Sequence, residues 1–392
     1  MPVSHKIAAA PENLAIYVHW PFCRSKCPYC DFNSHVRERV DEAAWTAALR
    51  RELDYFRRLS GPRTVTSVFF GGGTPSLMRG ATVGRILDKI AENWSVNRNV
   101  EITLEANPTS VEARKFADFA EAGVNRVSLG VQALNDDDLK ALGREHSVRE
   151  ARDAIALSQK YFAWSSYDLI YARMGQNLRD WEKELSEAID LTADHLSLYQ
   201  LTIERGTAFY QARQKGRIIL PEEDIAADMY ALTQEISAAA GIPAYEVSNH
   251  ARPGEESRHN LTYWQYGDYI GVGPGAHGRL TVGGRRYAFA QDRSPEKWLK
   301  NVDDKGQATD QQESLSPQMM AEEMVMMGLR LVRGLDLVSF EYIVGNKLEK
   351  FIDSDYLRRL FELDYMERDG RLLKATAQGM PLLNGLLGRL LA

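Results

Sequence analysis

The three cysteines of this 392-residue chain, Cys23, Cys27 and Cys30, lie within one short segment, WPFCRSKCPYCDFNS. A four-iron, four-sulfur (4Fe-4S) cluster normally takes four thiolate ligands. Three cysteines at C-x3-C-x2-C spacing therefore leave one iron without a protein ligand. An iron with an open position can bind the amino and carboxylate groups of S-adenosylmethionine (SAM) and pass one electron to its sulfonium. The spacing predicts a cluster-binding loop that also receives SAM.

Other uses of these cysteines have to be weighed. Three cysteines cannot all be paired in a disulfide framework. Structural zinc prefers four ligands, commonly from two C-x2-C-type pairs. The chain has no second pair, and neither His35 nor Asp31, which could complete a zinc site, has a partner at the normal spacing. The cysteines could also be unligated core residues. Tyr29, an aromatic residue before the last cysteine, makes the pattern more specific, and we favour the iron–sulfur interpretation.

Seven further candidate residues share one kind of position, near an end of an apolar segment: Gly72, Gly73, Thr74, Glu105, Gln132, Arg144 and Asp168. Glycine lets the backbone approach a ligand closely, and arginine suits a carboxylate. The acids suit ribose hydroxyls or an ammonium group. Taken singly, each of these residues is more often a turn, capping or ion-pair residue. Together they indicate a site for a zwitterionic, ribose-bearing ligand.

The elements that must position these residues alternate regularly. Apolar, β-branched segments are expected as strands at 14–20, 66–73, 100–108, 126–132, 167–172 and 195–201. A segment with helical spacing follows each of the six strands. This order predicts parallel βαβ units with right-handed crossovers. The predicted fold is α/β, a partial (β/α)6 barrel that corresponds to an open (β/α)8 barrel, in which functional residues gather at the carboxyl ends of the strands.

The pattern changes beyond the sixth strand. We expect a helix at 221–241, a strand at 242–251, and a hairpin at 279–290 that turns at Gly283–Gly284. The polar stretch 303–314 is predicted to be a linker. Two helices, a two-stranded turn at Asp369–Gly370 and a last amphipathic helix resemble a small winged-helix module. The predicted domains are therefore a barrel with a C-terminal extension at 1–303 and a small helical, winged-helix-like domain at 304–392.

Composition excludes several classes of function. The net charge of −6, from 48 basic and 54 acidic residues, provides no basic field for nucleic acid. No apolar stretch of about 18 residues is present, so no membrane span is expected. The first residues are too weakly apolar for a signal peptide. Free thiols in a cluster loop fit a reducing compartment, and the predicted location is cytoplasmic.

Six segments of the chain together match one known pattern: YVHWPFCRSKCPYCDF, FFGGGTPS, LEANP, RVSLGVQ, DLIYARMGQ and RHNLTYWQYGDYIGVGPGAHG. The chain resembles the radical-SAM family of oxygen-independent coproporphyrinogen III oxidases and related heme chaperones, over nearly its whole length. The resemblance implies that the three cysteines hold the cluster. It also implies a set of SAM contacts: Tyr17, Gly72, Gly73, Thr74, Glu105, Gln132, Arg144 and Asp168. Some family members bind two SAM molecules, so this set could divide between two sites.

Two departures place the chain within that family. The oxidases carry a further cysteine where this chain has Phe32, and they carry a long segment before the cluster loop, where only 22 residues precede Cys23. Both differences resemble the heme chaperone group, whose H-N-x-x-Y-W motif is present here as His259, Asn260, Tyr263 and Trp264. The resemblance implies cytoplasmic heme binding and delivery to heme-accepting proteins, including acceptors at a membrane.

Alternatives remain open for the identity of the heme ligand and for the reaction. A heme site needs an axial ligand and apolar or aromatic walls, and His259 with its neighbouring tyrosines is the first candidate. His259 could instead be a hydrogen-bonded core residue, and His250 and His277 compete as ligands. Two enzymatic readings also stay open. One is oxidative decarboxylation of coproporphyrinogen III, and the other is radical-SAM chemistry on an unrelated substrate.

Overall fold

The computed structural model describes residues 12–192 and 194–391, and within them eleven strands form one curved sheet. Their spatial order is β13 (Thr309–Ser314), β12 (Arg285–Gln291), β11 (His277–Val282), β10 (Tyr269–Val272), β1 (Asn13–Trp20), β4 (Thr64–Gly72), β5 (Ser95–Ala106), β6 (Arg126–Gln132), β7 (Trp164–Tyr171), β8 (His195–Gln200) and β9 (Asn249–Ala251). The strands from β1 to β8 in this order run parallel. The predicted (β/α)6 barrel is confirmed.

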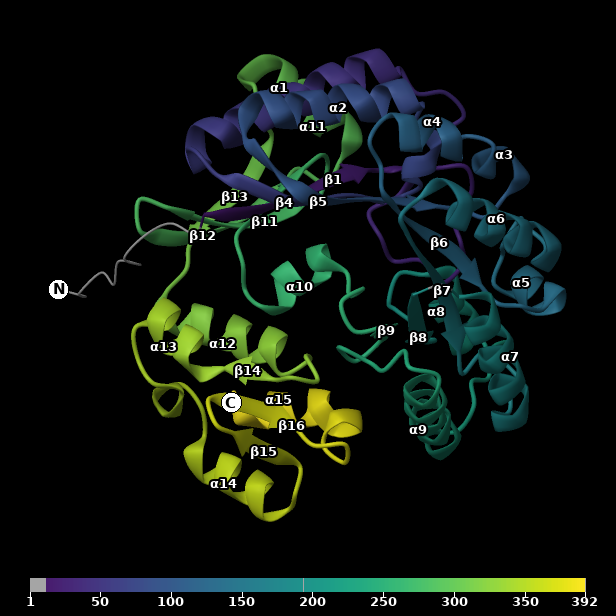
Figure 1. The fold of residues 1–392 in the computed structure, drawn as a ribbon, viewed down its shortest axis with the longest axis vertical. Helices are drawn as coiled ribbons and strands as arrows, with labels where there is room; N and C mark the ends of the chain where they lie inside the picture. The colour runs from purple at the N-terminus through teal and green to yellow at the C-terminus, as the bar shows by residue number, and fades with distance from the viewer. Residues whose placement is uncertain (1–11, 193, 392) are drawn as a thin grey trace.

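Helices cover the outer face of this sheet (Figure 1). They are α1 (Glu42–Ser60), α2 (Gly80–Asn93), α3 (Ser110–Ala113), α4 (Phe116–Glu121), α5 (Asp136–Ala141), α6 (Val148–Tyr161) and α7 (Leu178–Leu191). The helix α1 begins where the Asp41 carboxylate accepts the backbone N–H groups of Ala43 and Ala44, a strong start signal. Its apolar stripe is buried against the sheet, as its spacing predicted.

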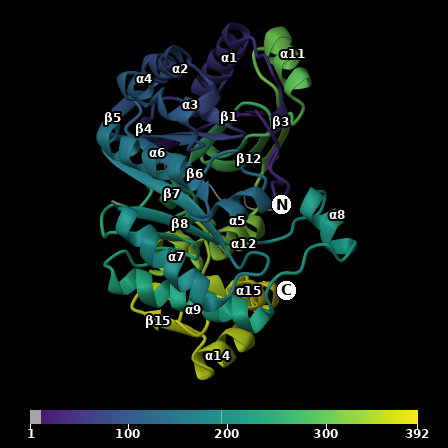
Figure 2. The same cartoon turned by 90° about the vertical axis from the view of Figure 1, so that its right-hand side faces the viewer.

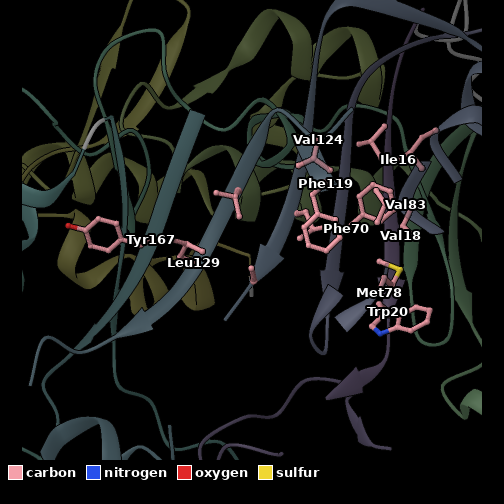
Figure 3. Close-up of a cluster of buried hydrophobic side chains, with 14 of the residues drawn as sticks. Ile16, Val18, Trp20, Phe70, Met78, Val83, Phe119, Val124, Leu129 and Tyr167 are labelled. Atoms are coloured by element: carbon pink, nitrogen blue, oxygen red, sulfur yellow. The ribbon is translucent and has the colours of Figure 1, made fainter. Parts of the chain in front are cut away.

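Alternate side chains of β1 point into the apolar core and into the barrel interior. Successive side chains of a strand point to opposite faces, and Ile16, Val18 and Trp20 are buried in the apolar layer with Phe70 of β4 and Val83 of α2 (Figure 3). The residues between them, including Tyr17, therefore face the interior of the barrel. The hydrophobic pattern that builds the core thus also fixes which side chains can reach a ligand.

The extension beyond the barrel differs from its prediction at two places. The stretch 303–314 is not a linker, because α11 (Pro295–Lys305) runs into it and β13 pairs antiparallel with β12. The side chains of β13 are almost all exposed, and an edge strand held by backbone hydrogen bonds needs no apolar pattern. The predicted strand 242–251 shortens to β9. The hairpin of β11 and β12 turns at Gly283–Gly284 as expected.

Further helices lie around the open side of the barrel: α8 (Ala208–Gln214), α9 (Glu223–Ala239) and α10 (Arg258–Trp264). Figure 2 places α8 at the periphery of the molecule, whereas α10 lies between the sheet and the C-terminal helices (Figure 1). The helix α10 was not predicted. It begins where Ser257 accepts the N–H of Asn260 and where the buried Glu101 accepts the N–H groups of Arg258 and His259. No helix of the described residues is long and apolar enough to cross a membrane.

The C-terminal residues form a smaller unit with its own apolar cluster. Its elements follow the order α12 (Pro317–Gly328), β14 (Leu335–Asp336), α13 (Leu337–Val344), α14 (Ser354–Glu362), β15 (Met366–Asp369), β16 (Leu372–Ala375) and α15 (Leu383–Leu390). The strands form a small sheet in the order β14-β16-β15. This is the helix–strand–helix–helix–strand–strand order of a winged helix, which agrees with the predicted module.

Candidate functional site

The cysteine loop is closed by two short strands at the carboxyl end of β1. β2 (Phe22–Cys23) pairs parallel with β3 (His35–Val36), so the intervening loop returns to its starting point. Within it, the N–H of Cys30 donates to the carbonyl of Cys27 at 3.1 Å and forms a tight turn. Cys23 is buried and the other two cysteines are half-buried. Burial raises the pKa of the Cys23 and Cys30 thiols.

The glycine segment after β4 fits beneath this loop. The N–H of Gly73 donates to the Trp20 carbonyl at 2.7 Å, and the N–H of Thr74 donates to the Phe22 carbonyl at 2.8 Å. A Cβ on Gly73 would lie 2.7 Å from the oxygen of Phe22, so only glycine permits this approach. The Thr74 hydroxyl donates to the Cys23 sulfur at 3.5 Å. The glycines thus bring two strand ends and one thiol together.

Ten of the twelve predicted site residues line a single open cavity of about 1060 Å³: Cys23, Cys27, Cys30, Gly72, Gly73, Thr74, Glu105, Gln132, Arg144 and Asp168. This volume includes space that is open to solvent. Tyr17 and His259 do not line this cavity but line a second cavity of about 690 Å³ inside the barrel. Glu105 and Asp168 line both cavities. The two carboxyl groups therefore stand between the cysteine side of the barrel and its interior.

Arg144 connects the cysteine loop to the strand ends. Its guanidinium donates to the Cys27 sulfur at 3.3 Å and to the Gly130 carbonyl at 2.8 Å. Its buried Nε has no hydrogen-bond partner among the described residues. Gln132 ends β6 with a φ of 73°, a left-handed conformation that a non-glycine residue rarely adopts and that is common at functional sites. Both residues present polar groups to the first cavity.

Glu105 and Asp168 are half-buried acids without an ion-pair partner in the described part of the chain. Glu105 accepts the N–H of Gly72 at 3.2 Å, and Asp168 accepts the Ser128 hydroxyl at 3.3 Å. Burial raises the pKa of Glu105 to about 8, and the charge of Asp168 adds to this effect. Burial also raises the pKa of Asp168 to about 6. Such a pair favours a ligand that brings a positive charge or hydrogen-bond donors.

The two predicted residues of the second cavity are held by hydrogen bonds. The Tyr17 hydroxyl and His19 Nδ1 lie 3.0 Å apart. His259 is almost fully buried, with Nδ1 at 2.9 Å from the Ser67 hydroxyl and Nε2 at 2.6 Å from the Tyr263 hydroxyl. Burial lowers its pKa to about 3, so the ring is neutral. A heme iron could take either nitrogen only after one of these hydrogen bonds breaks.

The competing histidines differ in exposure. His250 is buried on β9, and neither ring nitrogen has a partner among the described residues. His277, at the start of β11, is exposed. Neither histidine lines the two cavities described above. For each of the three histidines, the role of axial heme ligand stays a prediction.

Two residues of the site were missed from the sequence. Asn107 accepts a hydrogen bond from the Arg144 guanidinium at 2.5 Å, and it lies two positions after Glu105. That spacing, beyond the end of a strand, was a usable signal. Asn33 donates from its amide to the carbonyls of Pro274 and Arg293, at 2.9 Å each, and so ties the cysteine loop to the barrel extension. Its partners lie about 250 residues away, and no local pattern indicates them.

The donor set fits an iron–sulfur cluster better than zinc. Within 12–192 and 194–391, no three His, Cys, Asp or Glu side chains converge as ligands of one metal ion, which structural zinc would require. A cluster bonds each thiolate to a different iron, so it does not need that convergence. Three thiols in one loop, beside an arginine and two glycines, suit the cluster.

A partial barrel with three cysteines at the end of its first strand and acids at later strand ends defines the radical-SAM class. The family model of the radical SAM superfamily matches residues 17–188, and that of the HemN C-terminal domain matches residues 315–382. The chain is 36% identical to heme chaperone HemW from Escherichia coli (strain K12), over 97% of this chain and 98% of that protein. It therefore belongs to the radical-SAM family that contains heme chaperone HemW.

Other relatives support the same assignment. Radical S-adenosyl methionine domain-containing protein 1, mitochondrial, from Bos taurus is 40% identical over 98% of this chain and 89% of that protein. The solved structure of coproporphyrinogen III oxidase (HemN) from Escherichia coli, described as a radical SAM enzyme, superposes with a TM-score of 0.81 at 22% identity. The superposition covers 96% of this chain and 90% of that chain. At this identity, the likeness establishes a shared fold.

Proposed function

We propose that this chain is a heme chaperone that binds a 4Fe-4S cluster, SAM and heme and delivers heme to an acceptor protein. The observation that carries the proposal is the similarity to heme chaperone HemW over nearly the full length of both chains. The cavity that joins three thiols, an arginine and two half-buried acids supports the cluster and SAM. Phe32, in place of a further cysteine, supports heme handling over porphyrinogen oxidation.

In this proposal each side chain has a binding task. Cys23, Cys27 and Cys30 would hold the cluster, which supplies an electron to SAM when reduced. Arg144 would face a carboxylate, for which its guanidinium is suited. Glu105 and Asp168 would accept donors or balance positive charge, and the backbone of Gly72 and Gly73 would allow close approach. Gln132, Thr74 and Tyr17 complete the proposed SAM contacts.

Heme would bind near the H-N-x-x-Y-W motif on α10, with His259 as the predicted ligand. The location of this helix between the barrel and the C-terminal unit (Figure 1) supports the idea, because a ligand there could contact both. Delivery would occur in the cytoplasm, to acceptors that include membrane-associated heme proteins. We also propose two domains, and the end of β13 together with the start of the HemN C-terminal match favours a boundary at 314/315 rather than 303/304.

The proposal is tested with purified protein whose cluster is reconstituted anaerobically. Heme is titrated in while the heme absorbance is followed, and a heme-free acceptor protein is then added. We expect a heme complex and transfer of heme to the acceptor. A Cys27→Ala variant should lose the near-ultraviolet iron–sulfur absorbance. Absence of heme-dependent absorbance in the loaded wild-type chain would overturn the proposed function.

The alternative is coproporphyrinogen III oxidation, which the shared fold with HemN favours. The same preparation is incubated with coproporphyrinogen III, SAM and a reductant, while protoporphyrinogen and deoxyadenosine are measured together. The chaperone proposal expects no protoporphyrinogen. Product formation at more than one turnover per chain would establish the oxidase instead.

A further inference from the structure

The cysteine loop packs on an apolar cluster that is separate from the main core. This satellite cluster has Leu139, Leu142, Ile170, Leu201 and Phe209 at its buried centre. The side chain of Tyr29, from between Cys27 and Cys30, packs against it. The satellite cluster therefore lies beneath the half of the loop that carries two of the three thiols.

Phe209 contacts this half of the loop in two ways. Its backbone N–H donates to the carbonyl of Pro28 at 2.9 Å. Its ring lies 6.1 Å from the ring of Tyr29, centre to centre, at an angle of 56°. Phe209 itself is buried. Pro28 and Tyr29, the two residues between Cys27 and Cys30, thus both contact Phe209. Pro28 contacts its backbone, and Tyr29 contacts its ring.

The same turn is also held by the segment before α6. Gly143 has a φ of 69°, and a Cβ there would lie 2.6 Å from the Pro28 ring. The next residue, Arg144, donates to the Cys27 sulfur at 3.3 Å. Both Gly143–Arg144 and Phe209 therefore contact the turn of Cys27–Cys30. Cys23 is held separately, by β2 and by Thr74.

Phe209 belongs to a long excursion of the chain. Residues 201–222 leave the barrel after β8, form α8 and return to α9. The hydroxyl of the buried Thr207 accepts the N–H of Tyr210 at 3.1 Å and fixes the start of α8. Figure 2 shows α8 at the edge of the molecule. Phe209 gives this excursion a contact with the cysteine loop through its backbone and its ring.

We infer that Phe209 is a positioning residue for the cysteine loop, which fixes the spacing of the Cys27 and Cys30 thiols and slows loss of the cluster that they hold. The inference rests on the proposed function only for the presence of the cluster, because the contacts of Phe209 with the loop are made within the chain itself. Without the ring, Tyr29 loses a packing contact, while Pro28 keeps its backbone hydrogen bond, and the two thiols sample open conformations. Cys23 keeps its own contacts and should not respond.

The test measures each thiol separately in the cluster-free protein. Wild type, Phe209→Ala, Phe209→Leu and the matched control Tyr210→Ala are alkylated briefly with N-ethylmaleimide without oxygen, and each cysteine is quantified by mass spectrometry. In Phe209→Ala, labelling of Cys27 and Cys30 should rise about five-fold, which corresponds to about 1 kcal/mol of local opening. Cys23 should label at the wild-type rate. Phe209→Leu should restore most of the protection, and Tyr210→Ala should match wild type.

A second measurement uses the reconstituted protein. Iron release to a ferrous chelator should be several-fold faster in Phe209→Ala, and the electron paramagnetic resonance spectrum of its reduced cluster should change. Unchanged labelling of Cys27 and Cys30, or an equal rise at all three cysteines, would overturn the inference. If wild type takes up no cluster, the proposed cofactor fails, while the alkylation rates still decide the role of Phe209.

Discussion

Two half-buried acids dominate the chemistry of the site at the scale of single residues. Glu105 and Asp168 both have raised pKa values because burial penalises their charged forms. At neutral pH, Glu105 is therefore mainly protonated in the ligand-free chain. A cationic ligand reverses this preference, because it stabilises the carboxylate. Binding should then be linked to proton release.

This linkage predicts a pH dependence of SAM affinity. The association constant should rise by up to about tenfold per pH unit from about pH 6 to pH 8, and should level off above the pKa of Glu105. Calorimetry in two buffers of different ionisation enthalpy measures the released protons. Glu105→Gln should flatten the profile, whereas Glu145→Gln, an exposed acid on the rim of the same cavity, should keep it. A flat wild-type profile would contradict the assignment of Glu105.

Besides its predicted role as a heme ligand, His259 is expected to stabilise the fold. In His259→Ala, the hydroxyls of Ser67 and Tyr263 lose their partner in a buried site. The free energy of unfolding should fall by roughly 2–4 kcal/mol, measured by denaturant titration. His277→Ala, at an exposed position, should change it by less than about 0.5 kcal/mol. Heme absorbance of both variants then identifies the ligand, and loss of heme binding only in His277→Ala would exclude His259.

Local spacing explains which residues of the site could be predicted. Cys23, Cys27 and Cys30 are close in the sequence, so one loop suffices to gather them. Glu105 follows from its place at the end of β5, because strand ends meet at one edge of a parallel sheet, whereas Asp168 lies within β7. The partner of His259 is Ser67, 192 residues away, and that of Pro28 is Phe209. Such pairs depend on how distant elements pack, which no local pattern records.

At the scale of elements, one buried carboxylate joins α1 to the barrel extension. Glu52 accepts the N–H groups of Gly273 at 2.8 Å and Ala308 at 3.1 Å, and the indole N–H of Trp298 at 3.1 Å. These donors come from the loop after β10, from α11 and from the start of β13. A single side chain of α1 therefore holds three segments of the extension beside β1.

Glu52→Gln tests this connection. The glutamine amide replaces one acceptor oxygen with an NH2 donor. This donor would face the N–H groups that now donate to Glu52. The free energy of unfolding should fall by roughly 1–3 kcal/mol, because at least one buried N–H is left without a partner. Urea titration followed by tryptophan fluorescence measures the loss. Glu182→Gln, at an exposed position of α7, is the matched control and should have little effect.

Elements with a strong hydrophobic pattern were predictable. The strand 126–132 has the same bounds in the structure as in its prediction, because its apolar residues Val127, Leu129 and Val131 alternate along the strand and are buried in the core. The strand β13 has no such pattern, since its sequence TDQQES is exposed, and it was mistaken for a linker. Its pairing with β12 depends on backbone groups alone, and these are common to every sequence.

At the scale of the whole molecule, one ion pair joins the C-terminal unit to the barrel extension. Arg279 of β11 donates to Glu323 of α12 at 2.7 and 3.0 Å, and the Tyr266 hydroxyl donates to the same carboxylate at 2.6 Å. The pair is only about one-fifth exposed. Such partly buried, bidentate contacts are stronger than ordinary surface ion pairs.

Breaking this pair should loosen the small unit without unfolding the barrel. In Glu323→Arg, hydrogen exchange in α12 should accelerate, and limited proteolysis near residue 315 should increase. The double variant Arg279→Glu with Glu323→Arg should recover part of the protection, since the charges are again opposite. Equal exchange rates in wild type and Glu323→Arg would show that the apolar contacts hold the two parts together.

The polar edge strand β13 has a further consequence. An open sheet exposes unpaired backbone groups at both ends, and another chain can pair with them. Here one end is β9, a strand of three residues, and the other end is β13, whose exposed side chains are polar or charged. Neither end offers a long, flat, apolar strand to a second copy of the chain. The residues that looked like a linker therefore protect the sheet against edge-to-edge aggregation.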